Sequence, residues 1–380
     1  MAETLLPDYG WVIVSLLGGL LVSLIFVLGT NLLLGTLYMD TIRRRAVLIA
    51  VGRKCGYVFA ALLAFGVTVY LAFPLIFETV FSRGLRTWGV LVAAIAAQWI
   101  AYLICNLNGN LLGSRIFRIF LLIIGFLAPF FLGTAIGTCF TGAEFTVDRT
   151  ATPAVVTWTG AWHGLEALTR PLAVLLGLVV VCLSVILGAL YIIRAVDDHS
   201  LRKQMRRTVR VMTIPFLVLF IVWFVLLMFR RGFSVDADGV VSMEKYKYLM
   251  NLLHHRPMLV EFAVGIVLVL VGLYLGVFTK SRRKGFWFTL GGTVLVVAGV
   301  LFLAGFHGTA FYPSLTDLQS SLTIWNTAAG GDTLQTLFWA SLSLPFLVAG
   351  LGYLWHRTDH RKKISVRGLE RKDAQRQSLQ

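Results

Sequence analysis

Two acidic residues combine a chemically useful group with a position inside an apolar segment. Glu78 lies near the end of one apolar run, and Glu261 lies one turn inside another. An ionisable group within a membrane is costly, so each acid is a candidate for proton transfer or for contact with a ligand. A carboxyl so near the end of a run could instead reach water and have only a structural role. The sequence leaves both interpretations open.

Amide side chains form a second group of candidates. Asn31 lies within the first apolar run, and Asn106 and Asn108 lie close together where the third run ends. An amide can orient water along a proton path, but it can equally form hydrogen bonds between neighbouring helices. We therefore predict that Asn31, Glu78, Asn106 and Asn108 form either a proton path or polar contacts between helices.

The histidines argue against a haem or a metal centre held by this chain. Each of the seven lies in a connection or at the end of an apolar run. Haems inside helical membrane subunits usually take axial histidines from the interior of the helices. Met212 and Met228 are alternative ligands, although methionine more often fills gaps in packing. We expect this chain to ligate no cofactor and no metal. The histidines are His163, His199, His254, His255, His307, His356 and His360.

Motifs of soluble enzymes are absent from the sequence. There is no Walker A loop, no HExxH and no GxSxG pattern. The four cysteines form no CxxC pair and lie in or beside apolar runs, as small buried residues do. The Gly–Gly pairs at 18–19, 291–292 and 330–331 are predicted to be close helix contacts or turns. We predict no catalytic residue in this chain.

All of these candidate residues lie within or beside long apolar runs, so the structure of the runs determines their positions. Hydrophobic residues make up 58% of the 380 residues, and the mean hydropathy is +0.81. Soluble domains contain only about 45–50% apolar residues. Nine runs have a length that suits a membrane-spanning helix. The sequence therefore predicts an all-α polytopic membrane protein with about nine transmembrane helices. The runs cover residues 11–38, 55–81, 87–107, 117–140, 171–193, 211–229, 258–279, 286–306 and 335–355.

The basic residues predict how the chain crosses the membrane. With the N-terminus outside, 25 of the 34 Lys and Arg residues lie on the cytoplasmic side and 9 on the other side. Because cytoplasmic loops carry an excess of Lys and Arg, we predict a periplasmic N-terminus and a cytoplasmic C-terminus in a bacterial inner membrane. Residues 357–380 then form a basic cytoplasmic tail. This placement also accounts for the net charge of +16 without nucleic acid as a partner.

Several segments resemble one family of membrane proteins. Residues 126–137 and 142–148 are similar to the fourth span and following loop of subunit II of cytochrome bd quinol oxidases. The most specific segment is Ser321–Asn326, which reads Ser-Leu-Thr-Ile-Trp-Asn and precedes the last run. The similarity covers roughly residues 120–360. Its other segments are 169–177, 188–191, 256–259, 311–314 and 333–336.

The resemblance implies an architecture of two four-helix bundles and one peripheral helix. The first bundle would cover about residues 1–140, and the second bundle with the peripheral helix about 165–356, in a single integral membrane domain. It also implies a heterodimer in which subunit I carries haems b and d, oxidises quinol and reduces dioxygen to water. This chain would then be the structural partner of subunit I and would ligate no haem.

Further partners are expected around this subunit. We predict Trp325, Asn326 and Glu261 as contacts to the partner subunit, to a quinone or to a lipid. Membrane lipids, a structural quinone and small accessory subunits are candidate partners.

The N-terminal third departs from the family pattern. Family members carry an acid-rich stretch in the first span, where this sequence has Leu28–Asn31. The stretches 53–58 and 104–108 also replace family motifs. Because those family positions line a polar route for protons, the resemblance does not assign that role to this chain.

Two other functions stay open at this stage. A secondary transporter would be consistent with helices broken at Pro74, Pro129, Pro215 and Pro345, although charge in the middle of the spans is missing. A haem-free membrane anchor of a quinone-linked dehydrogenase would have a similar composition. Co-purification distinguishes the three functions: a haem-rich partner indicates the oxidase, an iron–sulfur partner the dehydrogenase, and no partner the transporter.

Overall fold

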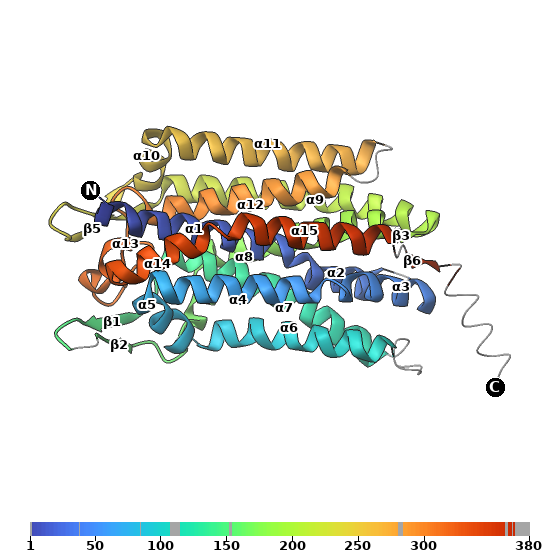
Figure 1. Cartoon of the computed structure of the whole chain (residues 1–380), viewed down its shortest axis with the longest axis horizontal. Coiled ribbons are helices and arrows are strands. Elements are labelled where there is room, and N and C mark those ends of the chain that lie inside the picture. The colour runs from blue at the N-terminus through green and yellow to red at the C-terminus, as the bar shows by residue number, and fades with distance from the viewer. Residues whose placement is uncertain are drawn as a thin grey trace.

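Long helices dominate the computed structural model and run side by side along one axis (Figure 1). Among the described residues, eight helical segments are long and apolar enough to cross a membrane. Helix α6 (Leu85–Asn106) adds a shorter apolar stretch, Trp88–Leu103. These segments correspond to the nine predicted runs and confirm the all-α polytopic class. The structure describes residues 2–37, 39–83, 85–106, 115–151, 154–279, 284–361, 364–366 and 368.

The remaining elements follow the chain in order. In the first half the helices are α1 (Ala2–Leu24), α2 (Phe26–Thr36), α3 (Thr41–Gly52), α4 (Cys55–Ala72), α5 (Pro74–Ile76), the π-helix η1 (Phe77–Arg83), α7 (Arg115–Thr141), the 3-10 helix η3 (Leu165–Thr169) and α8 (Pro171–Ala195). In the second half they are α9 (His199–Phe229), α10 (Lys247–His254), α11 (Arg256–Phe278), α12 (Lys284–Gly305), the 3-10 helix η4 (Leu318–Ser320), α13 (Ile324–Thr327), α14 (Gly331–Ser341) and α15 (Leu344–Arg361). The strands are β1 (Phe145–Asp148), β2 (Val155–Trp158), β3 (Val196–Asp197), β4 (Arg231–Val235), β5 (Val241–Lys245) and β6 (Ile364–Ser365).

The segment before the second predicted span differs from its prediction. Residues 41–54 fall between the first two predicted runs and were therefore expected to be a cytoplasmic connection. Most of them instead form α3, which buries Ala46, Val47 and Leu48 completely. The apolar stretch of this helix packs into the core, while Arg43 pairs with acids at its start. This connection is therefore a helix rather than a loop, because its apolar residues pack into the core.

Glycines allow the central helices to approach one another closely. Gly133 of α7 faces Gly177 of α8, where an added Cβ would lie 2.7 Å from the opposite Cα. Small residues at such crossings permit close backbone contact inside a membrane. Helix α1 packs against both α4 and α12, and α2 packs against α7 and α8, so the helices share one continuous core. The division into two four-helix bundles stays a prediction.

The two ends of the molecule differ in structure. The hairpins β1–β2 and β4–β5, helix α13 and the start of α1 gather at one end, which we call the hairpin end (Figure 1). Helix α3, strand β6 and the end of α15 lie at the opposite end. The first and last long helices thus begin and finish at opposite ends, as an odd number of crossings requires.

The last span is the least covered by the rest of the chain. In the most apolar part of Gly331–Asp359 only 11% of the residues are buried, against 83% for the first span. Phe346 and Tyr353 of α15 are 80% and 64% exposed. This span must face lipid or another protein over most of its surface.

Candidate functional site

Asn31 forms a buried contact between helices. Its side chain is completely buried in α2, and its Nδ2 donates a hydrogen bond to Oε1 of Gln98 in α6. Gln98 is also fully buried. This geometry suits the polar-contact interpretation of Asn31, and a role in proton transfer stays a prediction.

The other members of the predicted polar group lie elsewhere. Glu78 belongs to η1, next to α5 at the hairpin end, whereas α2 extends toward the opposite end (Figure 1). Asn106 is the last residue of α6, and its side chain lies outside the described part of the structure. Asn108 lies outside the described residues altogether. The structure therefore does not bring Asn31 and Glu78 together.

A large cavity at the hairpin end contains two of the predicted contact residues. Its volume is about 990 Å³, and both Glu261 and Trp325 line it. The walls come from the start of α1, the β4–β5 hairpin, the start of α11 and the loop after α12. We call this space the hairpin-end cavity. The sequence marked both residues as contacts but gave no sign that they share one cavity.

The side chain of Asn326 forms hydrogen bonds within its own loop. Its Oδ1 accepts a hydrogen bond from the backbone N–H of Thr323 at 2.8 Å, and Thr323 Oγ1 accepts one from the N–H of Asn326 at 3.1 Å. These reciprocal bonds form a capping box at the start of α13. The Nδ2 of Asn326 also donates to the carbonyl of Ser321 at 3.0 Å. The family-like segment Ser321–Asn326 thus shapes a tight turn, and the predicted contact with another molecule stays a prediction.

Two histidines that the sequence did not connect also meet in this cavity. The rings of His255 and His307 lie 4.4 Å apart, measured between centroids, and both residues line the cavity. Burial lowers the pKa of His307 below its usual range, and the neighbouring His255 and Lys247 lower it further. The pairing depends on the fold, because one residue precedes α11 and the other follows α12.

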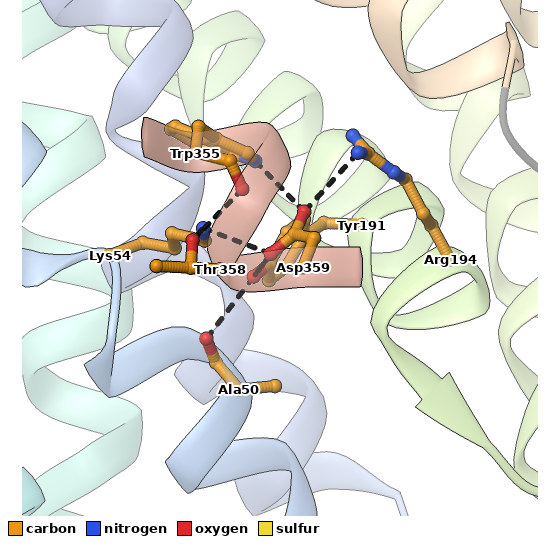
Figure 2. A network of polar contacts seen from close by, with 7 residues as sticks. All are labelled: Ala50, Lys54, Tyr191, Arg194, Trp355, Thr358 and Asp359. Atoms are coloured by element: carbon orange, nitrogen blue, oxygen red, sulfur yellow. Dashed lines mark hydrogen bonds and ion pairs between the residues drawn. The ribbon is translucent and has the colours of Figure 1, made fainter. Parts of the chain in front are cut away.

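A second site at the opposite end is built from buried charges (Figure 2). The carboxylate of Asp359 in α15 lies 2.9 Å from Nζ of Lys54 and 3.3 Å from Nη2 of Arg194. The side chains of Lys54, Arg194 and Asp359 are 1%, 6% and 10% exposed. Trp355 Nε1 donates to the same carboxylate at 3.0 Å, and Tyr191 donates to it at 3.5 Å.

This charge network connects three distant parts of the chain. Lys54 lies between α3 and α4, Arg194 is near the end of α8, and Asp359 belongs to α15. Lys54 also donates to Thr358 and lies 4.3 Å from the ring centroid of Trp355. The sequence gave no signal for the network, because all three charges fell in segments expected to be loops or tail. Its geometry fastens α15 to the core of the molecule.

The described residues contain no group of three or more His, Cys, Asp or Glu side chains that could hold a metal ion. Their histidines lie in connections or near helix ends, a placement that does not fit a haem buried in the middle of the bundle. The expectation that this chain holds neither stays a prediction.

One of the comparisons with known proteins identifies a family. A family model described as cytochrome bd terminal oxidase subunit II matches residues 6–358. Among solved structures, the chain is similar to "The structure of bd oxidase from Geobacillus thermodenitrificans", with 16% sequence identity and a TM-score of 0.61. The match covers 94% of this chain and 99% of that chain, and at this identity it shows the fold alone. No curated protein matches this chain. Because the family model spans almost every helix, the chain belongs to the cytochrome bd terminal oxidase subunit II family.

Proposed function

We propose that this chain is the haem-free half of a bd-type oxidase, in which a haem-bearing subunit I oxidises quinol and reduces dioxygen to water. The observation that carries the proposal is the family match over residues 6–358, which extends into every span of the described residues. The positions of the described histidines support it, because they do not suit a buried haem. The role of this chain is to complete and support the complex.

The face that we propose for subunit I is formed by α4 and α15. These helices meet where the rings of Tyr57 and Trp355 lie 4.8 Å apart. Leu63 on α4 and Leu347 on α15 are 51% and 58% exposed. Gly66 and Gly352 have no heavy atom within 4 Å of an added Cβ, so another helix could approach the backbone closely. The exposed last span supports this choice, since a partner there would cover the least buried part of the chain.

Purification through a tag on this chain tests the function. We expect a haem-rich partner to co-purify and to give a reduced-minus-oxidised haem spectrum, whereas this chain expressed alone should show no Soret band. Stoichiometric haem on the isolated chain would contradict the proposal. An iron–sulfur partner would instead indicate a dehydrogenase anchor, and the absence of any partner would indicate a transporter.

Bulky substitutions test the proposed face. Gly352→Trp and Gly66→Trp should reduce the amount of haem that co-purifies, because a large ring would separate the two subunits. Val267→Trp on α11 is the matched control, since Val267 is 57% exposed on a helix outside the α4–α15 face. Loss of the partner with the control but not with the glycine variants would place subunit I on α11 instead.

A further inference from the structure

The hairpin-end cavity is large enough for part of an amphipathic molecule. Its volume of about 990 Å³ is at the upper end of the range of roughly 300–1,000 Å³ found for small-molecule sites. Val12, Met258, Phe302, Phe306 and Trp325 give it apolar walls. It lies where α11 begins and α12 ends, and the ends of helices that span a membrane are expected near its surface. A lipid could therefore enter it from the bilayer.

The charge of the lining favours a cationic group. Asp8, Asp236 and Glu261 line the cavity, and its described lining includes no Lys or Arg. The lowered pKa of His307 favours the neutral form of that ring at neutral pH, so the nearby histidine adds little positive charge. A bare metal ion does not fit, because the described acids and histidines do not converge as a ligand group. An extended molecule with one cationic group suits the lining better.

Glu261 is the group with the greatest need for such a partner. Both of its carboxyl oxygens are buried, and neither has a hydrogen-bond partner among the described residues. Burying a carboxylate without a partner is costly. Because Glu261 also lines the cavity, the proposed contact requires its carboxyl to rotate about the side-chain bonds toward the ligand. An ammonium group offers three donors and a compensating charge.

We propose that the hairpin-end cavity binds the headgroup of an amine-bearing phospholipid, with the ammonium group at Glu261 and an acyl chain along the apolar wall. The ammonium pairs with the carboxylate, and no covalent step is involved. The lining residues of this cavity lie outside the α4–α15 face that we propose for subunit I. Phosphatidylethanolamine is the lipid that we expect, and anionic phosphatidylglycerol should be disfavoured by the three acids.

Native mass spectrometry of the complex tests this site. The complex is placed in nanodiscs with equal amounts of phosphatidylethanolamine and phosphatidylglycerol, and the lipids that stay bound to this chain are then counted. We expect phosphatidylethanolamine to be retained in preference by about tenfold, which corresponds to about 1.4 kcal/mol. Glu261→Gln should remove most of this preference, because it deletes the carboxylate that pairs with the ammonium group.

Two further variants make the result specific. Ala237→Trp places a large ring at the exposed hairpin rim of the cavity, so it should reduce lipid retention without altering charge or core packing. Asp332→Asn is the matched control, since it removes an exposed acid from α14 outside the cavity lining, and it should behave as wild type. Equal retention of the two lipids by the wild type would overturn the proposal. Wild-type retention in both cavity variants, or a quinone in place of the lipid, would overturn it as well.

Discussion

Buried polar side chains in this protein are explained by the partners that they meet. Asn31 and Gln98 are both fully buried on different helices, and each gains its partner only when α2 and α6 come together. Glu261, by contrast, has no described partner for its carboxyl oxygens. The sequence marked Asn31 and Glu261 in the same way, as polar residues in apolar runs. Only the packing separates a paired amide from an unpaired acid.

A double-mutant cycle tests the amide pair. We expect Asn31→Leu and Gln98→Leu each to lower the stability of the protein by about 1–3 kcal/mol, because each leaves one buried amide without its partner. The double variant should be more stable than the sum of the single effects predicts, since it removes both polar groups. Thermal unfolding in detergent measures all four proteins. Strict additivity would contradict a direct contact.

At the scale of elements, short polar contacts fix where helices begin and how they are held. Asp198 precedes α9 and accepts hydrogen bonds from the backbone N–H groups of Ser200 and Leu201, each at 3.3 Å. It also accepts a hydrogen bond from Nε of Arg43 at 2.7 Å, and this ion pair connects α9 to the start of α3. One carboxylate therefore caps a helix and links two elements.

Two substitutions at Asp198 separate these roles. Asp198→Asn keeps a good cap but loses the ion pair, which should cost less than about 1 kcal/mol. Asp198→Ala loses both contributions and should cost about 1–2 kcal/mol. Thermal unfolding at neutral pH measures both variants, and equal losses would show that the cap contributes little.

The ion pair should also make stability depend on pH. Burial would raise the pKa of Asp198, but the hydrogen bond and charge of Arg43, with the backbone N–H groups, outweigh it and lower the pKa overall. Its contribution is therefore present above the unfolded pKa of about 3.9 and is lost as the pH falls through the lower folded value. The difference between wild type and Asp198→Asn should shrink below about pH 3.9. A difference that grows on acidification would contradict this sign.

The last span depends on a different contact, the network around Asp359. Asp359→Asn leaves Lys54 and Arg194 buried without their carboxylate, which should cost roughly 3–5 kcal/mol. Adding Lys54→Met should recover part of the loss, because it removes one of the two cations. The temperature at which the protein loses its sharp size-exclusion peak measures this effect. Asp332→Asn serves as the control, and equal losses in it and in Asp359→Asn would show that the network is unimportant.

For the molecule as a whole, the spans could be predicted because hydropathy and length directly reflect the membrane environment. Helix α3 was not predicted, because its residues fall between two long apolar runs, although its own apolar residues are buried. The Asp359 network could not be predicted, since its three charges are far apart in sequence and meet only through packing. The hairpin-end cavity has the same origin, because its walls come from α1, a hairpin, α11 and the loop after α12.

The direction in which the molecule crosses the membrane stays a prediction, which rests on the charge distribution of the sequence. With the N-terminus outside, 25 of the 34 basic residues fall in segments that the sequence predicts to be cytoplasmic, and 9 fall in segments predicted to lie on the other side. Because cytoplasmic segments carry an excess of Lys and Arg, we predict that the hairpin end lies outside and the C-terminus inside. A reporter that fluoresces only in the cytoplasm should be active when fused after Gln380, and alkaline phosphatase at the same site should be inactive. The same pair fused within the β4–β5 hairpin, after Asp238, should give the opposite result. Phosphatase activity at Gln380 would reverse the orientation, and activity of the same reporter at both sites would contradict an odd number of crossings between the two fusion points.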